Sequence, residues 1–516
     1  MAGLGHTLRA LGAWRGRRSL VQQISTALSG PDGRVAVIGE DPALPGVFVV
    51  DPALSPSTMH ARLAGAGPFD LLVDATADAA GEIDRFRESF LHVRTGGSYV
   101  VAGAAAGTGE ALAALLEAGE SSDLTQAVGQ VRRTGGLLSV VRTGRTLAKL
   151  REREMNEALE VDPSRGRIMS SIPGAAFDSR CEMRVSRPPL RDQTKDRYEA
   201  PELFLREYEG VTCRPKSVVV QRGLLTPDTY RHHQSPRLTH KMLRDSWPRF
   251  AVTPKNEPPA RRLEGTYFHL DNEIRGFFGH ALTEQVSRLW AWDEVASQYP
   301  GIKALVSLNR GRPVADWEYE LLAAGGIARS DVEVIGEPVV VERLLSATPM
   351  FSMPAYVHPR ITETWDAVGW ELRSDAQQRE YPSRIFCTRE HGKRECTNRA
   401  EVEELFASYG FEVVLPERLP LPDQVELFHR ADVVAGFAGS AMFTTLFSDR
   451  PKHLVLVSPD TYGPSNEYMI SAVRGHRLDV AIGHSTAIEG VDPLKAPFTV
   501  EMADEGAWLR EVLDRL

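Results

Sequence analysis

The sequence predicts an α/β protein built from several Rossmann-type domains. Short apolar runs flanked by turn residues alternate with helical patterns, which is typical of parallel sheets covered by helices. The length of 516 residues exceeds what one hydrophobic core organises and fits three compact domains. Near residue 436, a glycine-containing turn follows a short apolar strand and opens a helix, as in phosphate-binding α/β domains.

The overall composition is that of an ordinary globular protein. Hydrophobic residues make up 42% and charged residues 25%, and the net charge of −9 gives no basic field for nucleic acid. No apolar run reaches 18 residues, and four cysteines are too few for a disulfide framework. We expect a cytoplasmic protein, with peripheral association at the inner membrane face as an open alternative, and no nucleic-acid partner.

Residues 1–140 are predicted to form the first Rossmann-like domain. A helical pattern over Ile83–Val93 lies between the last two of its strands. The expected strands are Arg34–Ile38, Val47–Val50, Asp70–Asp74 and Ser98–Ala102.

The first domain resembles a class I S-adenosylmethionine methyltransferase fold in its later half, FDLLVDAT followed by a helix and FLHVRTGGSYVVAG. The glycine-rich turn that such a cofactor needs does not follow Ile38, where Gly39-Glu40-Asp41-Pro42 stands instead. Asp51 ends the second strand at the place of a ribose-binding acid, but only about a dozen residues later. We interpret the domain as vestigial, with an active methyltransferase as the alternative.

Residues 141–200 are expected to form a helical and extended linker, in which a charged helix over Leu147–Leu159 presents a solvated face. A second α/β domain is predicted over 201–372. Its strands are Ser217–Gln221, Ala304–Leu308 and Val332–Val334, with a proline-rich irregular segment at 233–262.

An amphipathic helix predicted within this second domain contains the candidate acid–base residues. His280, Glu284 and Arg288 follow one another at intervals of four residues and share one helix face. Asp271 precedes the helix. A carboxylate next to a cationic side chain stays ionised and can act as a general base, so Glu284 with His280 is the first choice and Asp271 the second. A structural His–Glu pair is the equal alternative.

The third α/β domain is predicted over 373–490, with a C-terminal helix over 491–516. Basic residues Arg384, Arg389, Lys393 and Arg394 cluster around the strand Ile385–Cys387. The carboxyl ends of strands are where α/β sheets bind ligands, and arginine forks suit phosphate. A solvated basic loop is the alternative.

Other residues of this domain extend the predicted ligand site. Gly436, Gly439 and Ser440 belong to the strand–turn–helix, and Glu417 follows the strand Glu412–Leu415, where it can accept hydrogen bonds from ribose. Asn466 and Glu467 open a further helix toward the same place. Cys387, His391 and Cys396 lack zinc-site spacing, and we expect no metal.

Two blocks together resemble the family-61 glycosyltransferases of the DUF563 type. The first is Phe277–Trp292 with His280 and Glu284. The second block is Arg389–Phe447, and its matching positions are Arg394, Asn398, Gly410-Phe411-Glu412-Val413-Val414, Pro416-Glu417, Gln424, Ala431-Asp432 and Gly436. Many members carry a His-Gly-Ala turn, whereas this chain has Ala438-Gly439-Ser440, so no role of that histidine transfers.

The resemblance, over roughly 200–490, implies a GT-B-like pair of Rossmann-type domains and inversion at the transferred sugar. It implies a nucleotide-sugar co-substrate with no further cofactor. No Asp-x-Asp stands in a convincing context, so a metal-independent mechanism is expected. The donor-binding residues are then Arg384, Arg389, Arg394, Asn398, Glu417, Gly436, Gly439 and Ser440, and the catalytic candidates are Glu284, His280 and Asp271.

The leading functional hypothesis is a glycosyltransferase that extends a glycan or lipid-linked acceptor in capsular or cell-wall polysaccharide biosynthesis. Two alternatives stay open: an S-adenosylmethionine-dependent glycan methyltransferase acting through residues 1–140, and a catalytically inactive glycan-binding or scaffold protein.

Overall fold

The computed structural model describes residues 18–516 except positions 31–32, 77, 79, 103–111, 113, 115–123, 125, 135–136, 191, 236, 248, 254–258, 260, 310 and 391–392. The chain divides into two compact units. The first comprises Met1–Met169, Arg206–Gly265 and Glu337–Leu344, and the second Ser170–Leu205, Thr266–Gly336 and Leu345–Leu516. Each unit collects segments from distant parts of the sequence, a division that differs from the consecutive domains expected.

The N-terminal sheet of the first unit has the strand order β2-β1-β3-β4-β6-β5. Strands β1 to β4 pair in parallel, and β6 and β5 complete the sheet as antiparallel neighbours of β4. The four predicted strands are present, and two more follow. Their bounds are β1 Val35–Ile38, β2 Val47–Val50, β3 Phe69–Asp74, β4 Val93–Ala102, β5 Val128–Thr134 and β6 Leu137–Arg142.

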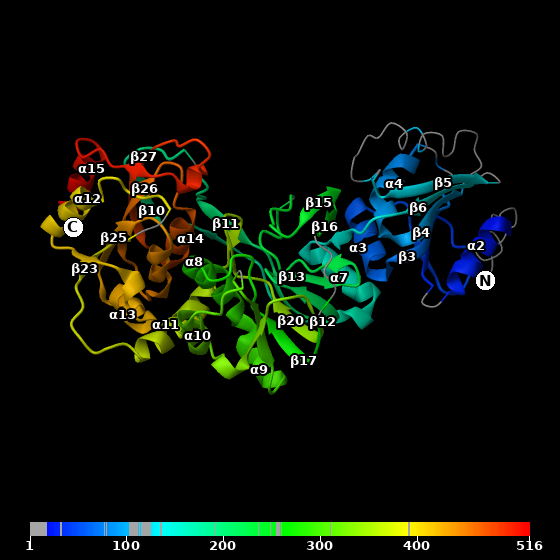
Figure 1. Ribbon diagram of the computed structural model, residues 1–516, viewed down its shortest axis with the longest axis horizontal. Coiled ribbons are helices and arrows are strands. Elements are labelled where there is room, and N and C mark those ends of the chain that lie inside the picture. The colour runs from blue at the N-terminus through cyan, green and yellow to red at the C-terminus, as the bar shows by residue number, and fades with distance from the viewer. Residues whose placement is uncertain are drawn as a thin grey trace. The chain divides into compact units, whose positions relative to one another are not determined.

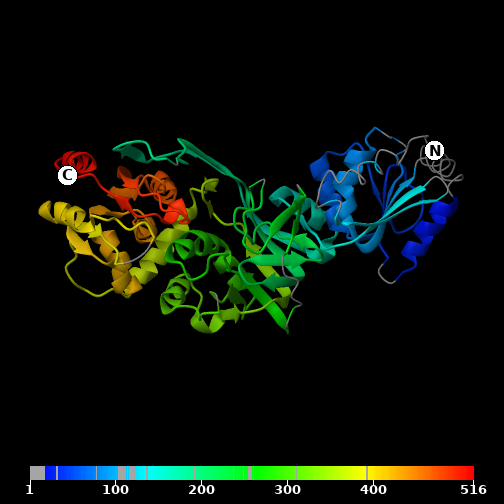
Figure 2. The same ribbon diagram turned by 45° about the horizontal axis from the view of Figure 1, so that its top comes forward.

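Helices cover both faces of this sheet (Figures 1 and 2). Helix α2 (Arg18–Leu28) buries Leu20 and Ile24 against the apolar side chains of β1 and β3. Helices α3 (Pro56–Ala66) and α4 (Glu82–Ser89) lie on the opposite face. Burial of branched side chains on both faces explains why these strands read as continuous apolar runs.

The predicted charged helix is shorter than expected, and its charges are not solvated. Residues 147–149 form strand β7 (Leu147–Lys149), and the helix α7 begins at Glu152 (Glu152–Val161). Glu152 is only 6% exposed and lies 2.5 Å from the fully buried Arg206. Charged residues of this helix therefore form buried ion pairs, because their partners lie on segments far along the chain.

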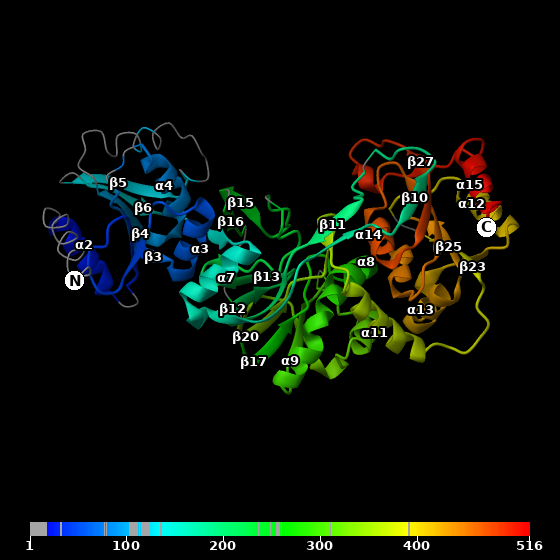
Figure 3. The ribbon, with the colours of Figure 1, turned by 180° about the vertical axis from the view of Figure 1, so that it is seen from behind.

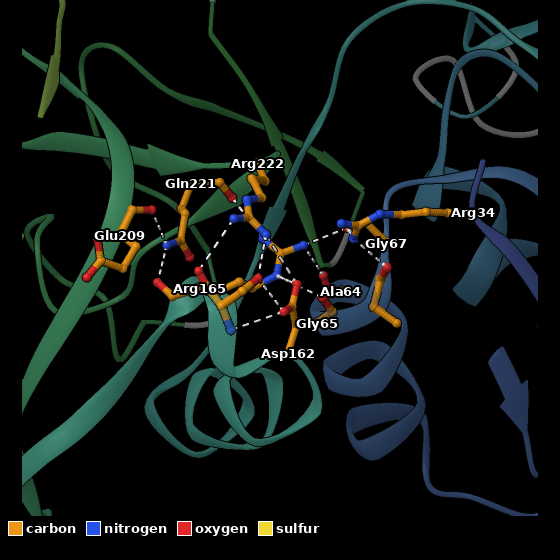
Figure 4. A network of polar contacts seen from close by, with 11 residues as sticks. Arg34, Ala64, Gly65, Gly67, Asp162, Arg165, Glu209, Gln221 and Arg222 are labelled. Carbon is orange, nitrogen blue, oxygen red and sulfur yellow. Dashed lines mark hydrogen bonds and ion pairs between the residues drawn. The ribbon is translucent and has the colours of Figure 1, made fainter. Parts of the chain in front are cut away.

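Two arginines bind the carboxyl end of helix α3 (Figure 4). Arg165 is fully buried, and its guanidinium donates to the carbonyl oxygens of Gly65 at 2.8 Å, Gly67 at 2.6 Å and Ala64 at 3.4 Å. Arg34 donates to the Ala66 carbonyl at 2.9 Å. The last carbonyls of a helix lack intrahelical partners and carry partial negative charge, so cations stabilise this end.

The remaining strands of the first unit follow the order β15-β16-β7-β14-β13-β12, and β8 pairs with β12. Strands β15 and β16 lie within the segment expected to be irregular. Strands β8, β12, β17 and β20 pass from one unit into the other. The bounds are η1 Phe90–His92, η2 Pro163–Arg165, β8 Gly166–Ile172, β12 Leu203–Arg214, β13 Val218–Gln221, β14 Leu224–Leu225, β15 Arg244–Trp247, β16 Phe250–Val252, β17 Arg261–His269 and β20 Val339–Ala347.

In the second unit, β17, β18 and β19 pair in parallel. The elements that accompany them are α8 Phe278–His280, η3 Ala281–Gln285, η4 Val286–Ala291, α9 Trp292–Gln298, β18 Lys303–Ser307, α10 Asp316–Ala324, η5 Arg329–Asp331, β19 Val332–Ile335, β21 Phe351–Ser352, β22 Tyr356–Val357 and α11 Ile361–Ser374.

The C-terminal sheet of the second unit has the strand order β24-β23-β25-β26-β27-β10, all parallel. Phe386, Phe437 and Val455 pack with α12 and α15 on one face, while α13 and α14 lie on the other (Figure 3). The bounds are β23 Arg384–Cys387, α12 Arg399–Ser408, β24 Glu412–Val414, η6 Pro416–Arg418, α13 Leu421–Arg430, β25 Val433–Phe437, η7 Ser440–Phe447, β26 His453–Pro459, α14 Ser465–Arg474, β27 Arg477–Ser485, η8 Pro493–Lys495, β28 Phe498–Thr499 and α15 Glu505–Leu513.

The edge of the C-terminal sheet is supplied by the segment that the sequence predicted to be a linker. Residues 170–205 form β9 (Ala175–Asp178), β10 (Glu182–Val185) and β11 (Arg197–Ala200), and β10 pairs with β27. Arg184 lies 2.6 Å from the buried Asp479 across this pair. The segment is therefore a structural part of the second unit (Figure 3).

The predicted α/β class is confirmed, because each of the three regions expected to be Rossmann-type contains a parallel sheet with helices. Across the described part of the chain, no helix combines the length and apolar character needed to cross a bilayer.

Candidate functional site

The C-terminal sheet has a topological switch point between β23 and β25. Strand β24 lies on one side of β23, and β25, β26 and β27 lie on the other. Loops that leave adjacent parallel strands in opposite directions open a crevice at the carboxyl edge, where α/β sheets hold ligands. Arg389 follows β23 by two residues and Gly439 follows β25 by two residues, so both lie at this edge.

Two guanidinium groups converge on Gly439. A Cβ atom built on Gly439 would lie 3.3 Å from Nη2 of Arg394 and 3.9 Å from Nη1 of Arg389. Arg389 donates to the Ala438 carbonyl at 3.2 Å and Arg394 to the Leu494 carbonyl at 3.4 Å. Among the described residues, neither arginine has a carboxylate within ion-pair distance. Burial and the neighbouring Arg394 charge lower the pKa of Arg389 to about 10, so the Arg389 guanidinium remains cationic at neutral pH.

A buried tyrosine and a buried acid complete this cluster. The Arg394 guanidinium carbon lies 4.1 Å from the centroid of the Tyr462 ring, a cation–π distance. The Tyr462 hydroxyl donates to the Glu467 carboxylate at 3.4 Å. Glu467 is 1% exposed, and burial raises its pKa to about 7. Glu467 lies on helix α14, which packs against η7 next to the turn formed by Gly439 and Ser440, named the phosphate turn after the ligand proposed for it.

The candidate catalytic pair, His280 and Glu284, lies on an irregular helix. Where the sequence predicted one amphipathic α-helix, the chain forms the short α8, a π-helical turn η3 and the 3₁₀ segment η4. Such interruptions are frequent at functional sites because they re-aim side chains. His280 Nδ1 still lies 2.7 Å from Oε1 of Glu284, and both side chains are partly exposed, at 28% and 17%. Arg288 is turned away and donates to the Ala347 carbonyl.

The structure brings the His280–Glu284 pair close to the phosphate turn within the second unit. A Cβ atom built on Gly279 would lie 2.8 Å from Ser440 Oγ and 2.7 Å from the Phe443 ring, so α8 packs directly on η7. The Lys393 ammonium lies 5.5 Å from the centroid of the Phe277 ring. Residues about 160 positions apart therefore line one surface, with the His–Glu pair next to exposed Ser440.

Two predicted donor-binding residues do not belong to this cluster. Arg384 is the first residue of β23, at the opposite edge of the sheet, and donates to the carbonyls of Tyr409 and the C-terminal Leu516. Asn398 precedes α12, and its amide exchanges two hydrogen bonds with the Val500 backbone, at 2.8 and 3.1 Å. Both side chains hold the C-terminal segment in place, so their expected ligand role is corrected to an anchoring role.

Three further candidates differ in what surrounds them. Gly436 lies inside β25, where a Cβ atom would come 2.6 Å from the Cys387 carbonyl, so glycine is required for packing. Asp271 is buried and accepts hydrogen bonds from the Ser307 amide and hydroxyl at 2.9 and 2.8 Å, which makes it an organiser of β18 rather than a free base. Glu417 is exposed in η6, at the carboxyl edge.

The cysteines of the candidate metal group are buried in the C-terminal core. Burial raises the pKa of the Cys396 thiol to about 11 and that of Cys387 further, so neither is a thiolate at neutral pH. His391 lies outside the described residues.

The vestigial interpretation of the first domain remains a prediction. Gly39 has φ +123 and donates its amide to the Val50 carbonyl, and the Asp51 carboxylate accepts from the Ala53 amide at 2.9 Å. Asp74, at the end of β3, is paired with Arg85 at 2.7 Å.

Sequence reasoning did not identify Tyr462. The signal was its place three residues after β26, in the loop that leads into α14, next to the carboxyl edge that binds ligands in such sheets. A single tyrosine in a loop does not indicate a ligand site until the pairing of β26 with β25 is known.

Comparison with known protein families matches residues 278–455 to the family described as Glycosyltransferase 61. A search among curated proteins gave no match. The matched segment includes α8, the His280–Glu284 pair, the basic loop after β23 and the turn at Gly439.

Two kinds of solved structure align with parts of the chain. The MycE methyltransferase of the mycinamycin biosynthetic pathway aligns at 19% identity over 21% of this chain and 36% of its own, with a TM-score of 0.18. The chain thus spans about a third of that protein's length. The iron-containing dodecameric heptosyltransferase TibC aligns at 10% identity over 54% of this chain and 82% of its own, with a TM-score of 0.23. TibC from enterotoxigenic E. coli H10407 gives 12% identity, 50% and 75% coverage and a TM-score of 0.21.

The structural likenesses are too low to carry an argument, so the assignment rests on the family match and the motifs it contains. The resemblance expected from the sequence is confirmed over residues 278–455, which match the family described as Glycosyltransferase 61.

Proposed function

We propose that this protein is an inverting, metal-independent glycosyltransferase that moves a sugar from a nucleotide-sugar donor to a glycan or lipid-linked acceptor. The observation that carries the proposal is the convergence of Arg389 and Arg394 on Gly439, at the switch point of a parallel sheet. The two guanidiniums have no carboxylate partner among the residues that the structure describes, and such a pair suits a diphosphate, whose oxygens accept hydrogen bonds from the planar forks. The family match over 278–455 supports glycosyl transfer as the reaction.

The reaction assigns a role to each part of the cluster. Glu284, oriented by His280, takes the proton of the acceptor hydroxyl while that oxygen attacks the anomeric carbon. The bond between the anomeric carbon and the diphosphate breaks as the new glycosidic bond forms. The electron pair leaves with the nucleoside diphosphate, whose growing charge Arg389 and Arg394 stabilise. Since two arginines supply this positive charge, we propose that no metal ion is required.

The proposal extends to the biological setting. Transfer to a polysaccharide or lipid-linked intermediate, as in capsule or cell-wall assembly, would place the protein in the cytoplasm or at the inner membrane face. Product analysis with lipid-linked and soluble oligosaccharide acceptors tests this part, and the anomeric configuration of the product by NMR tests inversion. Activity that persists in excess EDTA tests metal independence.

The first experiment is calorimetric titration with UDP, GDP, CMP and dTDP. Wild type is expected to bind one of them, and Arg389→Ala/Arg394→Ala to lose at least about a hundredfold in affinity, because two charge-assisted contacts to phosphate disappear. Arg510→Ala/Arg515→Ala removes two exposed charges of the same unit and serves as the matched control. Binding that survives in the first double variant would contradict the proposed donor site.

A further inference from the structure

Glu467 lies close to the phosphate turn. Helix α14, which carries Glu467, packs against η7, and Gly439 is the residue that precedes η7. The Gly439 backbone is among the groups that lower the pKa of the Glu467 carboxyl, against the larger effect of burial. A diphosphate held at Gly439 by Arg389 and Arg394 would therefore lie near a buried carboxylate.

The groups that face Glu467 come from each neighbouring element. The loop after β26 contributes the Tyr462 hydroxyl, at 3.4 to 3.5 Å from both carboxylate oxygens, and helix α14 contributes the Glu467 amide itself. The basic loop contributes the Arg394 charge, held over the Tyr462 ring, with Arg389 beyond it. Glu467 and the diphosphate site thus share Arg394, the charge nearest to both.

A bound diphosphate shifts the protonation equilibrium of Glu467 toward the protonated acid. Glu467 is 1% exposed, so water does not screen it from an anion placed on Arg394. A second negative charge near a carboxylate disfavours its ionised form. The charge of Arg394 also becomes divided between two anions. Both effects favour the protonated acid, which keeps its contact to Tyr462 because a carboxyl group still offers an acceptor oxygen.

We propose that Glu467 is a positioning residue of the donor site, which holds Tyr462 beneath Arg394 and takes up one proton from solvent when the donor diphosphate binds. This inference rests on the proposed donor site. The step is an acid–base equilibrium alone: an O–H bond forms on the carboxylate as the diphosphate binds and breaks as nucleoside diphosphate leaves. Since burial raises the pKa of Glu467 to about 7 in the free protein, the equilibrium lies in the physiological range.

The test measures how many protons the protein takes up when a nucleotide-sugar binds. UDP-, GDP- and dTDP-glucose are titrated calorimetrically at pH 7.0 in phosphate and in Tris, and the difference in apparent enthalpy gives the protons taken up. The diphosphate of a nucleotide-sugar has no ionisation near pH 7, so the protons belong to the protein. Wild type is expected to take up about 0.5 proton, and its affinity to fall up to tenfold between pH 7 and pH 8. Glu467→Gln, which keeps the acceptor oxygen, is expected to bind with no proton uptake and no such pH dependence.

Two controls keep the result decisive. Glu404→Gln changes an exposed acid of α12 and is expected to behave as wild type. Tyr462→Phe removes a bond that stabilises the carboxylate, so the pH midpoint of donor affinity is expected to move upward. If the nucleotide-sugar binds without proton uptake, or if uptake persists in Glu467→Gln, this inference is overturned while the donor site stands. If no nucleotide-sugar binds to folded wild type between pH 5.5 and 8.5, both proposals are overturned.

Discussion

The Nδ1 atom of His280 lies 2.7 Å from Oε1 of Glu284, and the glycine that precedes His280 packs on Ser440 of the phosphate turn. With a proton on Nδ1, the ring donates to the carboxylate, and this contact holds the Glu284 side chain beside the imidazole. The pair comes from the segment before β18, whereas the turn follows β25. The candidate catalytic pair and the proposed donor-binding turn therefore lie close together in the second unit.

Replacement of Glu284 by glutamine is expected to lower kcat by about a hundredfold to ten-thousandfold, because glutamine fills the same volume but takes no proton. Donor affinity is expected to stay within about twofold, since the arginines carry that contact. Turnover under saturating donor and calorimetric donor binding check both parts. Full activity of Glu284→Gln would show that His280 and Glu284 are a structural pair.

Asp271→Asn separates a structural role from a catalytic one. Asparagine keeps an acceptor oxygen for the Ser307 amide and hydroxyl, and Arg275 keeps its ion pair with Glu318 at 2.8 Å. We expect kcat to fall less than about threefold and unfolding stability to fall by roughly 1 kcal/mol, since one charge-assisted bond becomes neutral. A loss of activity as large as that of Glu284→Gln would instead identify Asp271 as the base.

The pKa of Glu467 predicts a pH dependence of stability. Burial raises this pKa from the ordinary value 4.5 to about 7, so between these values the folded protein binds a proton that the unfolded chain has released. Stability contributed by this group is present below pH 4.5 and is lost as the pH rises through 7, a change of roughly 3 kcal/mol.

Urea unfolding of wild type and Glu467→Gln at pH 5 and pH 8 checks this dependence. The two proteins are expected to have similar stability at pH 5, where Glu467 is protonated, and the glutamine variant to be the more stable at pH 8. A difference between the proteins that stays the same at both pH values would contradict the raised pKa.

Arg165→Met tests the polar network of the first unit (Figure 4). Methionine fits the buried space but leaves the carbonyls of Ala64 and Gly65 without this donor, while Gly67 keeps only its bond from Arg34 at 3.2 Å, at a cost of roughly 3 to 5 kcal/mol. We expect a marked loss of thermal stability, and faster hydrogen exchange of the α3 amides. Arg222→Met, in the same network but 41% exposed, is expected to cost less than about 1 kcal/mol. Equal losses in the two variants would show that burial is not the deciding factor.

Much of the fold followed from local patterns, because a buried parallel strand and its helix have a recognisable period. The strands β1 to β3 and the turn at Gly439 were predicted within a few residues. Side-chain roles were harder to predict. Arg384 and Arg389 are five residues apart, yet the strand between them carries one to each edge of the sheet. Asn398 bonds Val500, 102 residues away, and no local pattern reveals such a partner.

Glu152 was expected to be an exposed charge, and its burial escaped prediction for the same reason. Its partners Arg206 and His233 arrive from strands and loops far along the chain, so the alternating charges of the helix were read without them. The π-helical turn at Ala281–Gln285 likewise depends on packing, since its residues suit a regular α-helix.

The pairing of β10 with β27 has a consequence for the order in which the protein is made. The two strands are 295 residues apart, so β10 leaves the ribosome long before its partner exists. At ordinary rates of synthesis the wait is roughly 15 to 60 s. During that time the nascent chain carries an unpaired strand, and the C-terminal sheet closes only when almost the whole polypeptide has emerged. Translation speed and chaperone supply are therefore expected to govern the yield of active protein more strongly than for an enzyme whose domains are consecutive in sequence.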